Sequence, residues 1–288
     1  MRRRGDGVIP QPIHFNAYRY EFGNALSCGL LMPYNCRRAG LAAETWTRMS
    51  FPPSWGTSWF GDGWHNCRMD KREGRRLGEK RDMEKFVFGE CGLTDFEPLP
   101  VPPSKRQIHE PYVVLIPTLD THAKKNHHKL ELCLNRNGWK IVANHIRSMG
   151  MRVVAFTCDE ACDKFFAHDL ADISFHAEKK VLEPNTFLRN QIEWMSNAVT
   201  SVALGGAFHV AFTFAVPGIG FDGQMLKNYK AITASYKAKG KPIHVLPSAN
   251  SKSMEFGMQS YKIDPAVAAA FYPEYAKVIC RAITSVTD

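Results

Sequence analysis

Hydrophobic residues in the second part of the chain come in short runs that alternate with amphipathic stretches. Residues 112–117 and 152–157 are almost continuous apolar runs, which are typical of parallel strands buried on both faces. Between them, residues 137–149 place their apolar side chains on one helical face, and Gly150 follows as an end signal. The same reasoning predicts strands at 171–175, 201–204 and 243–246 and helices at 159–168, 185–198, 227–239 and 264–286. This alternation predicts an α/β fold with a Rossmann-like, doubly wound parallel sheet, whose ligands bind at the carboxyl ends of the strands.

The first hundred or so residues lack this pattern, because prolines and glycines interrupt them. Only residues 23–40 indicate a helix, and Pro33 predicts a kink in it. Residues 46–65 combine tryptophans with Gly, Ser and Thr, which predicts an aromatic loop. Such a loop is either a small hydrophobic cluster or a stacking surface for a sugar or a base. The proline-rich segment 97–103 is a stiff connector, so we expect an irregular N-terminal half, residues 1–103, and a Rossmann-like half, residues 104–288.

Composition narrows the class of protein without identifying it. Hydrophobic residues at 44% and charged residues at 23% are ordinary for a soluble protein with a core, and no apolar run approaches the roughly 20 residues of a membrane span. The basic N-terminus is not followed by an apolar segment, so we do not expect a secretory signal. We expect a cytoplasmic location instead. The eight cysteines are dispersed, which favours reduced thiols over disulfides or a metal site. A net charge of +9 indicates attraction to nucleic acid or to nucleotide phosphates, and does not decide between them.

Two loops after predicted strands have the chemistry of an anion site. A glycine turn after residues 201–204 lets backbone amides approach an anion, and a short helix with a histidine on its first turn follows. A loop rich in Lys and His follows residues 112–117, so both loops should face one crevice at the carboxyl edge. The alternatives are a buried core histidine in the first case and a solvated loop in the second. The residues concerned are Gly205, Gly206, Ala207, Phe208 and His209 in one loop, and Thr118, Lys124 and Lys125 in the other.

The order of these features resembles a known family. A helix at 191–198 precedes the strand at 201–204, Gly206-x-x-His209-x-Ala211 follows, and Pro217 comes eight residues after the histidine. This is similar to the C-terminal half of heptosyltransferase-like (ADP-heptose:lipopolysaccharide) glycosyltransferases of the GT-B class, whose pattern is Ser-Gly-x-x-His-x-Ala with a proline at that distance. The segments 135–139 and 150–154 also resemble the Asn-Trp helix and the Gly-led strand of that family.

The resemblance covers about residues 112–223 and has departures. Gly205 stands where the family has a serine, and the Gly-Asp pair of the N-terminal half is reduced to Phe22-Gly23-Asn24. The resemblance therefore implies a GT-B-like fold with a reduced N-terminal half. It does not carry a catalytic base over to this chain.

The resemblance implies a glycosyltransferase that moves a sugar from a nucleotide sugar to an acceptor hydroxyl. No cofactor is expected, and no metal is required if the protein supplies the positive charge. Gly205, Gly206 and His209 would hold the donor diphosphate, and a base on the N-terminal half would deprotonate the acceptor. For that base the sequence offers Asp62 and His65. The alternative is that both are loop residues without a catalytic role. The positive charge makes nucleic acid, such as hydroxylated bases of modified DNA, one candidate acceptor. The competing hypothesis is a non-catalytic nucleic-acid- or nucleotide-binding protein with a Rossmann-like domain.

Overall fold

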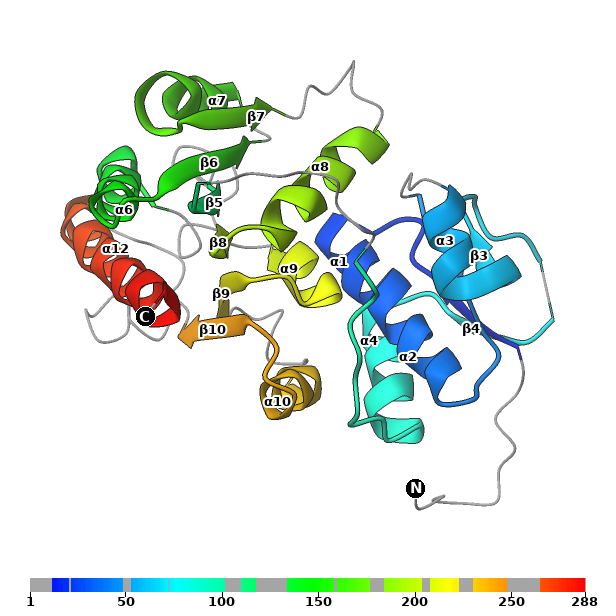
Figure 1. Cartoon of the computed structure of the whole chain (residues 1–288). Coiled ribbons are helices and arrows are strands. Elements are labelled where there is room, and N and C mark those ends of the chain that lie inside the picture. Colours follow the sequence, from blue (N-terminus) through cyan, green and yellow to red (C-terminus); the bar gives the residue numbers. More distant parts are fainter. Residues whose placement is uncertain are drawn as a thin grey trace.

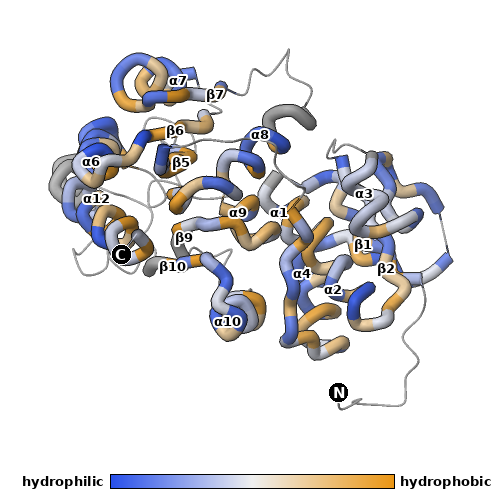
Figure 2. Tube along the Cα trace, in the orientation of Figure 1, coloured by the Kyte–Doolittle hydropathy of each residue, from blue (hydrophilic) through white to orange (hydrophobic). Residues whose placement is uncertain are grey.

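The chain folds around two parallel sheets, one in each half (Figure 1). A computed structural model describes residues 12–20, 22–48, 53–71, 73–101, 110–117, 134–157, 160–176, 184–203, 208–222, 230–247 and 265–287. Hydrophobic residues concentrate in the strands and on the helices between the two halves (Figure 2).

The larger sheet belongs to the second half and is all-parallel. Its order is β7-β6-β5-β8-β9-β10, which is 3-2-1-4-5-6 when the strands of this half are counted alone, the Rossmann order. The strands are β5 (Tyr112–Ile116), β6 (Arg152–Thr157), β7 (Ile173–His176), β8 (Thr200–Ala203), β9 (Gly218–Asp222) and β10 (Ile243–Pro247). The helices are α6 (Arg136–Ser148), α7 (Glu160–Phe165) with the π-helical η5 (Phe166–Leu170), α8 (Pro184–Ser196), α9 (Phe208–Phe214), α10 (Lys230–Ala238) and α12 (Pro265–Thr287). The predicted fold class is confirmed.

Helices cover both faces of this sheet because both faces are apolar. Along β5, Val113 and Leu115 belong to a core formed with α6 and α12, whereas Val114 and Ile116 belong to the core formed with α8, α9 and α10. The helix α6 is defined at both ends by local signals. The Asn135 side chain accepts a hydrogen bond from the Gly138 amide at 2.8 Å at its start. Gly150 has a φ of 75° just after its end, as the sequence predicts.

The first half is more regular than its sequence suggests. Four short parallel strands form a sheet in the order β3-β2-β1-β4, which repeats the start of the Rossmann order. The prediction of an irregular half is therefore wrong, although the half is reduced, since its strands are two to four residues long. The elements are β1 (Ile13–Asn16), α1 (Phe22–Leu26), η1 (Ser27–Leu31), α2 (Met32–Arg38), β2 (Ala43–Trp46), α3 (Pro53–Phe60), η2 (Gly61–Gly63), β3 (Trp64–His65), β4 (Arg75–Leu77), α4 (Lys80–Glu84) and η3 (Lys85–Glu90).

The tryptophan-rich segment is mostly part of the core. Trp46 and Trp59 are buried, and Trp55 and Trp64 are partly buried against the hydrophobic cluster that contains Trp59. The expected aromatic loop is instead the helix α3, a short 3-10 turn and strand β3. Because both rings are buried, neither Trp46 nor Trp59 offers a free face on which a sugar or a base could stack.

The helical segment predicted at 23–40 is present as the consecutive elements α1, η1 and α2, and it continues past Pro33. The π-helical turn η1 comes just before Pro33, which lies in the first turn of α2. Proline has no backbone N–H to donate, and the wider turn before it accommodates this gap in the helical hydrogen bonds. Gly29 in this turn approaches the sheet closely, because a Cβ on it would lie 2.6 Å from the Ala17 Cβ and 3.3 Å from the Thr47 Cγ2.

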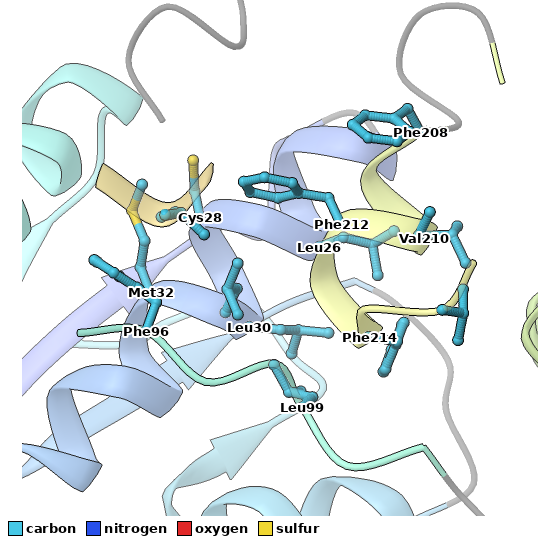
Figure 3. Packing of buried hydrophobic residues seen from close by; sticks show 14 of the residues in the cluster. Leu26, Cys28, Leu30, Met32, Phe96, Leu99, Phe208, Val210, Phe212 and Phe214 are labelled. Carbon is cyan, nitrogen blue, oxygen red and sulfur yellow. The ribbon is translucent and has the colours of Figure 1, made fainter. Parts of the chain in front are cut away.

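The two halves share one hydrophobic core. α9 of the second half contacts α1 and η1 of the first, and Leu26 and Leu30 lie beside Phe212 and Phe214 in this interface (Figure 3). The apolar surface of α9 is therefore covered by sheet on one side and by the first half on the other.

Residues 92–101, which join the halves, are attached to both. The Glu97 amide donates to the Asn35 Oδ1 at 2.8 Å, and the Asn35 Nδ2 donates back to the Glu97 carbonyl at 2.9 Å. From the other half, the Lys239 Nζ donates to the Phe96 carbonyl at 2.8 Å. The segment is thus a strap held to α2 and α10. The domain boundary predicted after residue 103 falls outside the described residues and stays a prediction.

Candidate functional site

The strand order of the larger sheet fixes the candidate site. The order reverses between β5 and β8, and ligands of open α/β sheets bind at the carboxyl ends of the strands at such a point. Ile116 pairs with Ala203, so the two strands end side by side. The candidate residues that follow these ends lie outside the described residues: Thr118, Lys124 and Lys125 after β5, and Gly205, Gly206 and Ala207 after β8.

Helix α9 begins at Phe208, where the sequence predicts a helix start. It lies close to the sheet because glycines in β9 leave room for it. A Cβ on Gly218 would lie 2.6 Å from the Ala211 Cβ, and a Cβ on Gly220 would overlap the Phe208 ring. The sequence Gly218-Ile-Gly220 thus positions the start of α9 over β9, next to the strand-order reversal.

His209 lies within the interface of the two halves. Its side chain is 3% exposed, and burial lowers the pKa of His209 to about 3, with the charge of Lys80 as a second cause. The imidazole is therefore neutral near pH 7, because removing the ring from water disfavours its charged form. It can take part in a hydrogen bond, but it does not supply positive charge to a diphosphate.

Lys80 brings the first half to the surroundings of this histidine. It begins α4 and forms an ion pair with Glu84 at 3.6 Å. Nearby in the same half, the Tyr20 hydroxyl donates to the Gly78 carbonyl at 3.0 Å, and burial raises the pKa of Tyr20. Of these groups, Lys80 is the one whose charge acts on His209 at the start of α9.

A polar cluster lies further along the carboxyl edge. Thr157 ends β6 and donates a hydrogen bond from its hydroxyl to the Asp163 carboxylate at 2.9 Å. His176 ends β7, and its Nδ1 is 3.8 Å from the same carboxylate. The histidine and the aspartate are both partly exposed. These groups can hydrogen-bond a polar ligand at the edge of the sheet that nucleotides occupy in Rossmann folds.

The two base candidates differ in their surroundings. Asp62 is exposed in the 3-10 turn η2. His65 ends β3 and is 21% exposed, with its Nε2 3.4 Å from the Glu44 Oε2. His14 faces the same carboxylate oxygen from β1, also at 3.4 Å. Sequence reasoning missed His14 and Glu44 because it did not recognise β1 and β2, where polar residues alternate with Ile13, Phe15 and Ala43.

Other features bear on the class of protein. Within the part of the chain that the structure describes, no three His, Cys, Asp or Glu side chains form a group that could hold a metal ion. No described helix combines the length and hydrophobicity needed to cross a membrane.

Comparison with known proteins gives a likeness in structure but none in sequence. No protein-family model matches the chain. No curated protein matches it either. Among solved structures, it is similar to the bacterial iron-containing dodecameric glycosyltransferase TibC from enterotoxigenic E. coli, with a TM-score of 0.51 and 15% identity over 77% of this chain and 61% of TibC. The calicheamicin glycosyltransferase CalG4 aligns over 88% of this chain and 66% of its own, at 14% identity and a TM-score of 0.32, too low to support an argument.

The similarity to TibC concerns the fold alone, and the chain spans 61% of the length of that protein. Together with the two parallel sheets, it identifies the fold as α/β and Rossmann-like, similar to that of the glycosyltransferase TibC.

Proposed function

We propose that the protein is a glycosyltransferase that moves a sugar from a nucleotide-sugar donor to an acceptor hydroxyl. The observation that carries the proposal is the arrangement of its two sheets. α1 follows the carboxyl end of β1, α9 follows the carboxyl end of β8, and the two helices contact each other. The carboxyl edges of both sheets therefore lead to one interface, which suits a reaction between a donor on one half and an acceptor on the other. The fold similarity to TibC supports the same class of reaction.

The donor diphosphate would bind at the reversal between β5 and β8. Backbone amides of Gly205, Gly206 and Ala207 would hold its oxygens, and Lys124 and Lys125 would supply positive charge. Thr118, Phe208 and the neutral His209 would complete this part of the site. The nucleoside would extend along the sheet edge toward the polar cluster at the ends of β6 and β7.

The acceptor would bind to the first half, where Asp62 and His65 are the candidate bases. The base would take the proton of the acceptor hydroxyl, whose oxygen would attack the anomeric carbon as the diphosphate leaves with the bonding electron pair. The proposal includes no cofactor, and a cytoplasmic location remains part of it. A nucleic-acid acceptor has no specific support, so it is tested beside other hydroxyl acceptors.

The test is transfer of labelled sugar from a panel of UDP, GDP and ADP sugars to glycan and DNA acceptors, with calorimetric titration of the free nucleoside diphosphates. We expect one nucleoside diphosphate to bind and the corresponding donor to turn over. Changing Lys124 and Lys125 together to Gln should weaken diphosphate binding by at least about tenfold, since charge-assisted hydrogen bonds are lost. Lys237→Gln, an exposed change on α10, serves as the control and should leave binding unchanged.

The competing hypothesis, a non-catalytic binding protein, predicts a different result. Binding to DNA or RNA would fall steeply with salt concentration, and no donor would turn over. Absence of both diphosphate binding and turnover would refute the glycosyltransferase proposal.

A further inference from the structure

One face of the smaller sheet carries polar residues where a core would be expected. His14 pairs with Glu44, and Trp46 pairs with His65, so these four side chains lie on the same side of the sheet. The opposite side packs on helices. There, Phe15 contacts Phe86 of η3 edge to face, with ring centroids 6.3 Å apart.

Three buried polar atoms converge on this face. The Nδ1 of His14 and the Nε2 of His65 each lie 3.4 Å from the Oε2 of Glu44. None of the three atoms makes a hydrogen bond of ordinary geometry to a described residue, although all three are inaccessible to solvent. Buried polar atoms are costly unless they are paired, so a carboxylate between two imidazoles calls for an explanation.

The outer contacts of the cluster limit how its members can turn. The Nε2 of His14 is 2.6 Å from the Glu73 carbonyl oxygen, which can only accept, so His14 donates there and keeps its Nδ1 toward Glu44. The ring of His65 stacks on Trp46, with centroids 4.3 Å apart and an angle of 22° between the planes. A neutral His14 therefore turns the lone pair of its Nδ1 toward Glu44 and cannot donate to it. Of the two imidazoles, while both are neutral, only His65, whose ring orientation is fixed by Trp46, can donate to Glu44.

The Nε2 of His65 faces the Glu44 carboxylate, and its Nδ1 faces away from it. A carboxylate accepts hydrogen bonds, which favours the hydrogen on Nε2. The Nδ1 makes no hydrogen bond to any residue that the structure describes, and the side chain is 21% exposed. The residue ends β3 at the carboxyl edge of the sheet, where its carbonyl accepts the Thr47 amide at 3.0 Å.

We propose that Glu44 is a positioning residue that holds His65 with its hydrogen on Nε2, so that the Nδ1 of His65 is the base for the acceptor hydroxyl. This inference rests on the proposed glycosyltransferase function, and it selects His65 over Asp62. In the step, the acceptor O–H proton passes to Nδ1, the acceptor oxygen bonds to the anomeric carbon, and the bond from that carbon to the diphosphate oxygen breaks. The carboxylate of Glu44 stabilises the imidazolium that forms, and the Trp46 ring beneath it adds a cation–π contribution.

Other charged groups near the cluster come from neighbouring elements. Arg76 on β4 pairs with His14 in register and is exposed. Arg37 on α2 lies against Gly63, since a Cβ there would be 2.7 Å from its Nη1, and Arg37 donates to the Ala43 carbonyl at 3.0 Å. Asp62 precedes this point and is exposed. Glu44 is therefore the carboxylate within ion-pair distance of His65 among the described residues.

The first experiment measures the tautomer and does not require turnover. Histidine side chains of the full chain are labelled with nitrogen-15, and the two ring nitrogens of His65 are followed by NMR, with the His65→Gln spectrum giving the assignment. We expect the hydrogen on Nε2 in the native protein and a mixture of tautomers in Glu44→Gln. A native hydrogen on Nδ1, or an unchanged tautomer in Glu44→Gln, would overturn the proposal.

The second experiment measures release of nucleoside diphosphate from the donor that the panel identifies. His65→Gln should lower kcat by at least about 100-fold, the range of a general base, and Glu44→Gln by about tenfold or more with little change in the KM of the donor. Glu44→Asp should restore part of kcat. A loss of kcat in Asp62→Asn as large as that in His65→Gln would overturn the choice of His65, and Asp169→Asn, an exposed change on η5, serves as the control.

The outcomes separate the two proposals. If the native protein turns over no donor, the glycosyltransferase function fails and the catalytic role of His65 fails with it, while the tautomer measurement still decides whether Glu44 positions the ring. If the native protein is active and Glu44→Gln leaves kcat unchanged, only the present inference fails. Thermal unfolding of each variant shows whether a loss of activity is a loss of fold.

Discussion

The burial of His209 makes acid stability a direct test of the interface between the halves. The pKa of this histidine is lowered to about 3 in the folded protein, first by burial and then by Lys80, from an ordinary value near 6.5. Protonation therefore favours the unfolded chain. The stabilisation is fully present above pH 6.5 and is lost as the pH falls.

The magnitude follows from the two pKa values. Relative to pH 8, the folded state loses about 2 kcal/mol at pH 5 and about 3 kcal/mol at pH 4 through this one residue. At pH 5 the figure changes little if the folded pKa is one unit higher, because the folded histidine remains mostly neutral.

The assay is urea unfolding between pH 8 and pH 5, with the free energy of unfolding compared for the native protein, His209→Gln and the exposed control His168→Gln. We expect the native protein and the control to lose about 2 kcal/mol more than His209→Gln over this range. The reasoning also predicts that binding of a nucleoside diphosphate gains nothing from protonation of His209. Parallel pH dependences of the native protein and His209→Gln would show that the histidine is not buried as a neutral ring.

Further changes test the packing of the two halves. Gly29→Ala should destabilise the fold by about 1–3 kcal/mol, because the added Cβ would crowd the edge of the smaller sheet. The control Gly89→Ala, whose Cβ would have 4.0 Å of clearance, should change the free energy of unfolding by no more than about 0.5 kcal/mol. Chemical unfolding measures both variants, and equal values would contradict the close approach of Gly29. Tyr112→Phe should cost about 1–2 kcal/mol, since the Trp194 carbonyl loses its buried donor at 2.7 Å, and an unchanged melting temperature would argue against that bond. Lys239→Met removes the partly exposed ammonium that holds the strap; we expect faster proteolysis within residues 92–101, and unchanged cleavage would show that the strap does not depend on it.

Much of the larger sheet could be predicted because its strands are buried on both faces. The run at 152–157 coincides with β6, and the cap signals at Asn135 and Gly150 delimit α6. The strand of this sheet that the sequence analysis missed, β9, lacks that signal. It contains Gly218 and Gly220, which leave space for α9 to pack on the sheet. Glycine is a poor indicator of a strand in a sequence.

The smaller sheet was missed for a different reason. Its strands are two to four residues long, and one face carries His14 and Glu44, so each strand offers only one or two apolar positions to a pattern search. The convergence of two histidines on one carboxylate depends on strand pairing of residue 14 with residue 44 and of residue 46 with residue 65, which no local pattern contains. In the same way, the burial of His209 depends on the first half packing over α9, so its neutral state could not be inferred from its place after a glycine turn.

The strap at residues 92–101 and the shared core around α9 have a consequence for how the molecule responds to heat and to ligands. The two sheets should unfold together, because separating them exposes Phe212 and Phe214 and breaks the hydrogen bonds of the strap. A nucleotide that engages only the larger sheet therefore protects the smaller one by mass action as well. A thermal-shift screen of nucleotides should report a single transition that moves as a whole.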